Sequence, residues 1–177
     1  LMFYKKIYKY LFFIVLIFYP NLTMANQSIL YLDMNYLLNN SLAGKSIVAQ
    51  LKNLNEKNLK KFKKIEEGLK LEENKLISQQ KILEKEEYAK QLNNFRKKVS
   101  NYQTERRNNN DNVLKKKSSA QKKLLNVIDP ILKDYSKKNS VLYIIPKKNI
   151  IIGNTELDIT QIILKSLDNN IKTINIK

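Results

Sequence analysis

The chain has 177 residues, with 33 Lys and Arg against 16 Asp and Glu, and the formal net charge of +17 makes an anionic partner the first expectation. It has no Cys and no His, which excludes a disulfide framework, the usual zinc sites, a Cys-His nucleophile and a Ser-His-Asp triad. We therefore expect no enzyme, no metal and no cofactor. Three Gly and three Pro are too few for a turn-rich all-β fold, so long helices are expected.

The first 25 residues have the three parts of a secretory signal peptide. Three lysines form a basic n-region, an apolar run follows at 11–19, and a small-x-small cleavage site ends at Ala25. The apolar run is much shorter than the ~20 residues that span a bilayer, which disfavours a retained anchor. We expect cleavage between Ala25 and Asn26. Because the leader holds three lysines and no acid, the remaining 152 residues keep 30 basic and 16 acidic residues, a net charge of +14.

A strand is predicted directly after the leader. Ser28 to Leu32 (SILYL) is a short apolar run with β-branched and aromatic residues. The stretch that follows, DMNYLLNNSLAGK, is expected to be a loop with one helical turn before Gly44.

The middle of the chain is predicted to be a helical hairpin with a coiled-coil seam. It has no strand signal, and its apolar residues recur at heptad spacing in two runs. The phase breaks between about Leu83 and Tyr88, where we place the tip. Gly68 weakens the first helix by roughly 1 kcal/mol relative to Ala, which predicts a bend there. The seam residues are Val48, Leu51, Phe62, Ile65, Leu69, Leu76 and Leu83 on the first helix and Leu92, Phe95, Val99, Tyr102, Val113, Leu124, Val127 and Ile128 on the second.

The last part of the chain is predicted to form a helix restart, a β-hairpin and a helix. Pro is poorly tolerated in a helix interior, and Asp129 can cap a helix with Pro130 at its first position, so a kink or a restart of the helix is expected there. The runs at 140–145 and 150–153 flank a polar turn, which predicts a β-hairpin. Asp158 precedes apolar residues at i, i+3, i+4 and i+8, which predicts an amphipathic helix lying on that hairpin.

The expected fold is α+β and mostly α, with a small β-body and a long helical arm. Three short strands and one helix bury little surface, and an exposed sheet edge invites a second copy, so self-association through the body is expected. The predicted parts are a signal peptide at 1–25, a first body segment at 26–44, the arm at 45–129 and a second body segment at 130–177.

This layout resembles the Skp family of periplasmic chaperones, also called the outer-membrane-protein-H (OmpH) family. The resemblance covers the whole chain after the leader and rests on the leader, on ILYLDMNYLLNNSLAGKSI, on the basic arms and on NIIIGNTELDITQIILKSL. Gly153 and the run from Leu157 to Thr160 stand where the family has its hairpin end and DIT helix start. The resemblance implies a trimer with three arms around a cavity. It also implies an ATP-independent holdase that keeps unfolded outer-membrane β-barrel proteins from aggregating in the periplasm.

Apolar seam residues of the arm are the candidates for contact with such a client. The alternative, which is the commoner role of heptad positions, is that they only hold the two helices together. A two-helix arm has no enclosed core, so both roles can coexist at different depths. The candidates are Phe62, Ile65, Leu69, Leu76, Phe95, Val99 and Tyr102.

Basic residues of the arm are predicted to steer acidic unfolded clients by a long-range positive field. Two alternatives stay open: a solvated face enriched in Lys by coding bias, and a surface for anionic lipid. The residues assigned to steering are Lys60, Lys61, Lys63, Lys64, Lys97, Lys98, Arg106 and Arg107.

Nucleic acid and nucleotides are not expected as ligands. Interspersed acids, a total of three Arg and the export signal disfavour nucleic acid. The sequence AGKS at 43–46 ends like a P-loop, but Asn39 stands where the first Gly of that motif would be. The alternative to a chaperone is a structural or adaptor coiled-coil protein of the cell envelope, which would dock on one folded partner.

Overall fold

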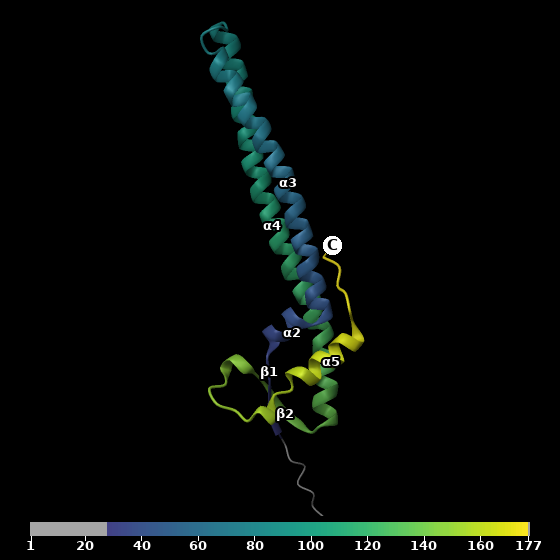
Figure 1. The fold of residues 1–177 in the computed structure, drawn as a ribbon. Helices are drawn as coiled ribbons and strands as arrows, with labels where there is room; N and C mark the ends of the chain where they lie inside the picture. Colours follow the sequence, from purple (N-terminus) through teal and green to yellow (C-terminus); the bar gives the residue numbers. More distant parts are fainter. Residues whose placement is uncertain (1–27, 177) are drawn as a thin grey trace, which may run out of the picture.

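A computed structural model describes residues 28–176, so the predicted signal peptide and its cleavage site at Ala25 and Asn26 lie outside the described residues. Figure 1 shows a small body from which a long helical hairpin projects. The mostly helical α+β fold is therefore confirmed. In chain order the elements are β1 (Ser28–Leu32), α2 (Met34–Asn40), α3 (Leu42–Gln79), α4 (Lys85–Lys138), β2 (Val141–Pro146), two 3-10 turns (Lys147–Asn149 and Thr155–Leu157) and α5 (Thr160–Asn170).

The sheet consists of two parallel strands, β1 and β2, with Leu30 opposite Ile144. Parallel pairing needs a long crossover, which the whole arm supplies. The predicted hairpin is wrong in its second strand, because residues 150–153 form no strand. Ile151 and Ile152 are 98% and 91% exposed. Their β-branched side chains suggested a strand, but β-propensity reflects packing against neighbours, and no other part of the described chain covers them.

The arm is formed by α3 and α4, which run antiparallel from the body to a tight tip (Figure 1). At 1.5 Å per residue, the 38 residues of α3 reach about 57 Å. The turn spans residues 80–84, a few residues before the break predicted from the heptads. Backbone N–H groups of Ile82 and Leu83 both donate to the Gln79 carbonyl at 3.0 Å, which closes the tip without Gly or Pro.

The heptad seam of α3 holds from Phe62 to the tip but not below it. Val48, predicted as a seam residue, is 55% exposed. Leu51 is half-buried as predicted, but above it Leu54 and Asn58 are half-buried, so two successive four-residue steps lead from Leu54 to Phe62. This is a stutter in the heptad, which turns the buried face of α3 as the helix enters the body.

Helix α4 runs through Pro130 as one continuous helix, so of the kink or restart predicted there the restart is wrong. Asp129 does not cap a helix; its carboxylate pairs with Lys133 at 2.6 Å, one turn further on. A proline inside a helix costs about 3 kcal/mol, but Leu124 and Ile128 beside it are fully buried in the body core. Tertiary packing therefore holds the helix across the proline.

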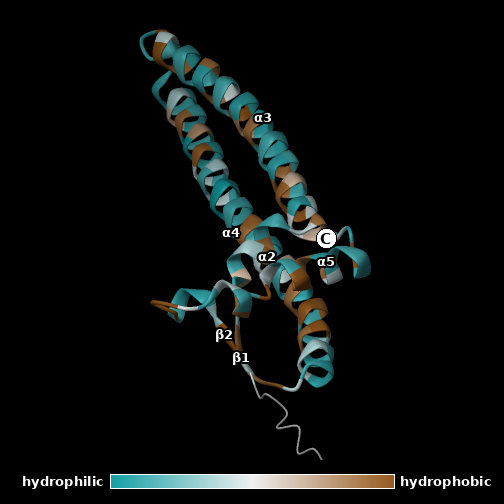
Figure 2. Ribbon diagram, turned by 60° about the horizontal axis from the view of Figure 1, so that its bottom comes forward, coloured by the Kyte–Doolittle hydropathy of each residue, from teal (hydrophilic) through white to brown (hydrophobic). Residues whose placement is uncertain are grey.

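The body core forms where β1, α2, the start of α3, the middle of α4 and α5 meet. Figure 2 shows apolar residues concentrated along α4 near the body, whereas the arm is mostly hydrophilic towards its tip. Helix α5 is amphipathic as predicted, but it packs mainly against α2 and α4, not on a hairpin. The largest fully buried apolar side chains are Leu37, Leu124, Ile128, Ile159, Ile163 and Leu167.

Asp158 joins β1 to the start of α5. Its neighbour Ile159 donates its N–H to the Tyr31 carbonyl at 3.0 Å, beside the strand edge. The Asp158 carboxylate accepts from the Thr160 N–H at 2.9 Å and from Lys147 at 2.7 Å. Burial alone would raise the pKa of this carboxyl, but the hydrogen bonds from Lys147 and Thr160 outweigh it and hold the pKa below its usual value.

We expect the free energy of unfolding to fall with acidification through Asp158. Because the pKa is lower in the folded state, the stabilisation is complete above the unfolded value and is lost as pH falls through the folded one, below about pH 4. Asp158→Ala should cost about 1 kcal/mol at pH 7, as for other acceptors at a helix N-terminus, and should flatten the acid limb. Urea denaturation from pH 3 to 7 measures both quantities. An unchanged acid limb in the variant would contradict this role.

Gly44 allows α2 and α3 to meet closely. A Cβ at this position would lie 2.0 Å from the Leu38 carbonyl oxygen, a backbone atom. Gly68, by contrast, has open space around it, and α3 runs through it as one continuous helix. The two glycines of α3 therefore form a matched pair for mutation. Close packing leaves no room for a side chain at Gly44, whereas there is room for one at Gly68.

Gly44→Ala should destabilise the body by about 1–3 kcal/mol, because the backbone must shift to make room for the methyl group. The matched variant Gly68→Ala should stabilise α3 by up to about 1 kcal/mol. Urea denaturation of both variants measures the difference. Hydrogen exchange around position 68 tests the predicted bend as well, with slower exchange expected in Gly68→Ala. Equal effects of the two substitutions on stability would refute the packing argument.

Candidate functional site: the helical arm

All seven apolar residues proposed to touch a client lie on the seam between α3 and α4. Phe62 and Leu76 are buried, with 7% and 6% exposed. The other five are half-buried, so in a single chain they pack the helices together and still present an edge to solvent. Their contact with a client stays a prediction. The half-buried residues are Ile65, Leu69, Phe95, Val99 and Tyr102.

A cluster of four side chains joins the two helices near the middle of the arm; we name it the arm clamp (Phe62, Glu66, Tyr102 and Arg106). The rings of Phe62 and Tyr102 meet edge to face, with centroids 5.9 Å apart. The Arg106 guanidinium lies 5.8 Å from both ring centroids, a cation–π arrangement. Glu66 accepts from Arg106 at 2.9 Å and from the Tyr102 hydroxyl.

The clamp changes the titration of its members. Loss of water around Tyr102, together with its hydrogen bond to Glu66, raises the pKa of the phenol, although Arg106 opposes this. The hydrogen bond from Arg106 to the Tyr102 oxygen raises the pKa of the guanidinium further. The clamp is therefore formed with a neutral phenol and a charged guanidinium. The sequence assigned Arg106 to steering and did not reveal its role in the clamp, because its partners Phe62 and Glu66 come from the other helix.

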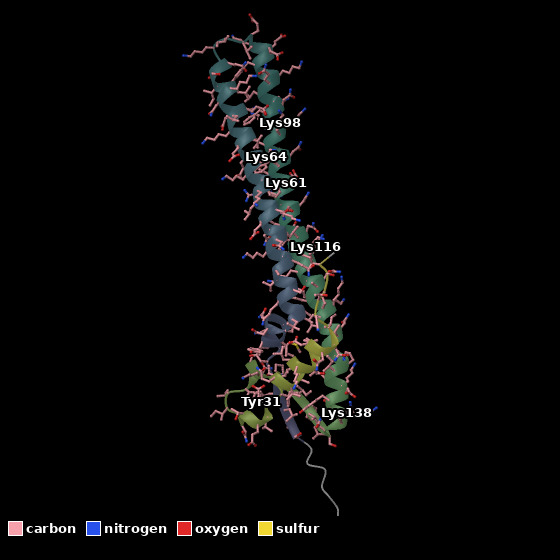
Figure 3. The ribbon with its side chains drawn as sticks, turned by 45° about the vertical axis from the view of Figure 1, so that its right-hand side comes forward. Tyr31, Lys61, Lys64, Lys98, Lys116 and Lys138 are labelled. Carbon is pink, nitrogen blue, oxygen red and sulfur yellow. The ribbon has the colours of Figure 1, made fainter. Side chains whose placement is uncertain are left out.

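The positive charge of the protein is concentrated on the arm. Helices α3 and α4 together carry 24 basic and 11 acidic residues, a net charge of +13. Figure 3 shows long charged side chains projecting along the whole arm, with Lys61, Lys64 and Lys98 labelled. A narrow two-helix projection cannot screen these charges behind protein, so its field extends into solvent over about a Debye length.

Three of the eight predicted steering residues form ion pairs between the two helices. Lys61 pairs with Glu105, Lys98 with Glu72 at 2.7 Å, and Arg106 with Glu66 at 2.9 Å. Exposed pairs of this kind contribute at most about 1 kcal/mol each. The other five are exposed, and none of them pairs with an acid of the described chain: Lys60, Lys63, Lys64, Lys97 and Arg107.

Towards the tip the seam contains more polar groups. Leu76 lies beside an open hollow of about 560 Å³, whose walls include Glu72, Gln91 and Lys98. Two buried polar atoms of α3, Nδ2 of Asn58 and Oε1 of Gln79, find no partner within the described residues. Unpartnered polar atoms weaken helix pairing, so the arm is held at intervals by apolar contacts and not by a continuous core.

The body exposes apolar side chains that sequence reasoning did not identify, although it expected self-association there. They lie on the two strands, on the loop after β2 and on α5. On β2 two adjacent residues, Leu142 and Tyr143, are exposed, which its uniformly apolar sequence did not reveal. The exposed residues, at half or more of their full area, are Ile29, Leu142, Tyr143, Ile151, Ile152 and Ile162.

Metal and membrane features are lacking in the part of the chain that the structure describes. No three His, Cys, Asp or Glu side chains within 28–176 lie close enough together to hold a metal ion. None of the helices in this range combines the length and the apolar character needed to cross a bilayer.

Comparison with known proteins identifies relatives of this architecture. The model of the family "Outer membrane protein (OmpH-like)" matches residues 28–167. The crystal structure of a candidate outer membrane chaperone (OmpH-like) from Caulobacter crescentus CB15 superposes with a TM-score of 0.79, covering 84% of this chain and 88% of that chain at 16% identity. At that identity the likeness shows a shared fold. A search of curated proteins finds no match.

Phe62→Ala should loosen the middle of the arm, because it removes the buried ring on which Tyr102 and Arg106 pack. The expected cost is about 3 kcal/mol, the lower end of the range for a core phenylalanine. Leu71→Ala is the matched control, since Leu71 lies on the same helix with 72% of its area exposed. Hydrogen exchange measured by mass spectrometry should show faster exchange in arm peptides around 62 and 102 for the first variant only. Equal exchange in the two variants would contradict the clamp.

Proposed function

This chain belongs to the OmpH-like family, and on that premise we propose that it is an ATP-independent holdase chaperone of the periplasm. Its clients are unfolded outer-membrane β-barrel proteins, which it keeps from aggregating. One observation carries the proposal: an arm of net charge +13 bears a seam of half-buried apolar residues along its length. The description of the Caulobacter protein as a candidate outer membrane chaperone supports it.

Capture begins with electrostatics. Five exposed basic residues of the steering set, Lys60, Lys63 and Lys64 among them, have no acidic partner in the described chain and contribute their full charge to the field. Unfolded barrel proteins are often acidic, so opposite charge raises the encounter rate. Such attraction is long-ranged and sequence-independent, which suits a protein that must accept many clients.

Holding depends on weak apolar contacts. A barrel strand has apolar side chains at alternate positions, and unfolding exposes all of them to water. The exposed edges of Ile65, Leu69 and Val99 offer small contact areas at intervals along the arm. Each contact is weak, but several contacts to one chain add by avidity, and the client can still leave. This arrangement needs no ATP, because nothing in it stores or releases a client by a chemical step.

We propose a homotrimer, with three arms that surround a shared cavity. The outward side chains Leu142 and Tyr143 of β2, together with the bare pair Ile151 and Ile152, form an apolar surface that water would disfavour. Contact between bodies would cover this surface and would extend the two-stranded sheet. A cavity between arms would also multiply the weak contacts available to one client.

The test is suppression of light scattering when a urea-unfolded barrel protein is diluted into buffer with this protein and without ATP. We expect suppression near equimolar trimer. Replacing Lys60, Lys63 and Lys64 with Gln should slow capture, and raising the salt from about 0.1 M to about 1 M should do the same, because the Debye length shrinks from about 10 Å to about 3 Å. The matched control makes the same charge change in exposed residues outside α3 and α4: Lys148, Lys165 and Lys172.

Three results would count against the proposal. Failure to suppress scattering at several-fold excess would remove the holdase activity and favour an adaptor that docks on one folded partner. Equal slowing by the arm and body variants would remove the steering role of the arm. A monomeric mass in light scattering at working concentration would remove the trimer.

A further inference from the structure

The C-terminal tail, residues 171–176, does not project freely but turns back along the base of the arm (Figure 1, yellow end). Figure 3 shows the tail rising beside Lys116 of α4. Ile174 is only 6% exposed and belongs to the body core, while Ile171 and Ile176 pack against that core. The tail lies beyond the residues that the family model matches, which end at 167.

Gln50 of α3 bonds the backbone of the tail as a neighbouring strand would. Its side-chain Nε2 donates to the Ile174 carbonyl at 2.7 Å, and its Oε1 accepts from the Ile176 N–H at 3.3 Å. In a parallel ladder one residue bonds the carbonyl and the N–H of two residues that flank its partner. The Gln50 amide reproduces this pair of bonds from a helix.

The remaining polar contacts of the tail also go to its main chain. Lys116 donates to the Ile176 carbonyl at 3.2 Å, and Lys123 donates to the Asn175 carbonyl at 3.4 Å. No side chain of the described tail forms a hydrogen bond or an ion pair. Beside Ile176 a hollow of about 300 Å³ remains, lined by Gln50, Leu54 and Lys116.

These contacts involve the main chain of an extended segment and apolar side chains two residues apart. They do not depend on which polar residue lies between those side chains. We propose that the surface formed by Gln50, Leu54, Lys116 and Lys123, here named the tail groove, is a binding site for extended segments of an unfolded client. The C-terminal tail occupies it until a client segment replaces it. This inference rests on the proposed holdase function and adds a site to it. An unfolded barrel strand, with apolar side chains at every second position, has the pattern that the groove takes from the tail.

Because the tail is covalently linked to the groove, it competes there with any other segment. A short tether gives the tail a local concentration in the millimolar range, so an isolated peptide competes poorly. A long client that already touches the arm at other points has the same advantage of proximity. The groove therefore opens to clients held by the arm and stays closed to free peptides.

The first experiment locks the tail in the full chain. Leu54→Cys and Ile176→Cys place two thiols beside one hollow, in a chain that otherwise has no Cys. A short bifunctional maleimide joins them, and the matched control is the same variant blocked with a monofunctional maleimide. A free tail leaves the groove open for part of the time, whereas a locked tail never does, so the locked form should need several-fold more protein than the blocked form for half-suppression of client scattering.

Equal suppression by the locked and blocked forms would overturn the tail groove while leaving the holdase intact. If wild type does not suppress scattering at all, the holdase proposal fails. Peptide binding, measured in the second experiment, then tests the tail groove by itself. The two failures are thus distinguishable.

The second experiment measures binding of a labelled peptide NNIKTINIK, the sequence of residues 169–177, by fluorescence anisotropy. Ile174→Ser with Ile176→Ser frees the groove and should bind the peptide at least about tenfold more tightly than wild type, because the tethered competitor is gone. Adding Gln50→Ala should abolish the gain. The matched control, Lys172→Ser with Asn175→Ser, alters only exposed tail side chains.

Equal affinity in all four proteins would refute the groove. Thermal unfolding followed by circular dichroism checks that each variant is folded. If the variant with Ile174→Ser and Ile176→Ser does not unfold cooperatively, the comparison of the locked and blocked forms tests the tail groove, because locking the tail leaves the folded chain intact.

Discussion

The arm has no interior, so its two helices depend on the small body core for their position. That core joins segments from both ends of the chain: Leu32 of β1, Leu37 of α2, Leu124 of α4 and Leu167 of α5 are all buried within it. Within the described residues the fully buried apolar side chains lie in this core, whereas in the arm the helices touch along one seam in which Phe62 and Leu76 are buried. The direction of the arm is therefore set at its base, and the contacts further up keep the two antiparallel helices side by side.

The charged residues of the arm contribute both to the pairing of its helices and to its external field. Glu66 and Glu72 face the seam and take basic partners from the opposite helix, while lysines without such partners point outward. Acids near the seam thus hold the helices together, and the excess of base supplies the external field. The arm clamp shows the combination in one place, since Arg106 contacts two rings and a carboxylate that come from both helices.

Much of this architecture could be predicted from the sequence, because heptad spacing reports directly which face of a helix is covered. The seam above Phe62 follows that rule. Val48 does not follow it, because the burial of α3 near the body is set by α2 and by the tail, which heptad spacing does not report. Two other predictions failed because local propensity does not include tertiary contacts. Residues 150–153 have strand propensity but pair with no strand of the described chain, whereas Pro130 disfavours a helix that the body core nevertheless stabilises.

For the candidate site, the sequence showed which residues are basic or apolar. Their pairing depends on the register between the helices, which the length of the tip turn fixes, and no local pattern records it.

The parallel pairing of β1 with β2 has a consequence for the order in which the protein takes shape. Ser28 is paired with Val141, so the sheet cannot close until nearly the entire chain is present. Contacts within α3 and α4 are local and form in microseconds, whereas closing so long a loop carries an entropic cost that only the finished core offsets. Because the chain is synthesised from its N-terminus, β1 stays unpaired while the arm folds. The body, which orients the arm, forms afterwards.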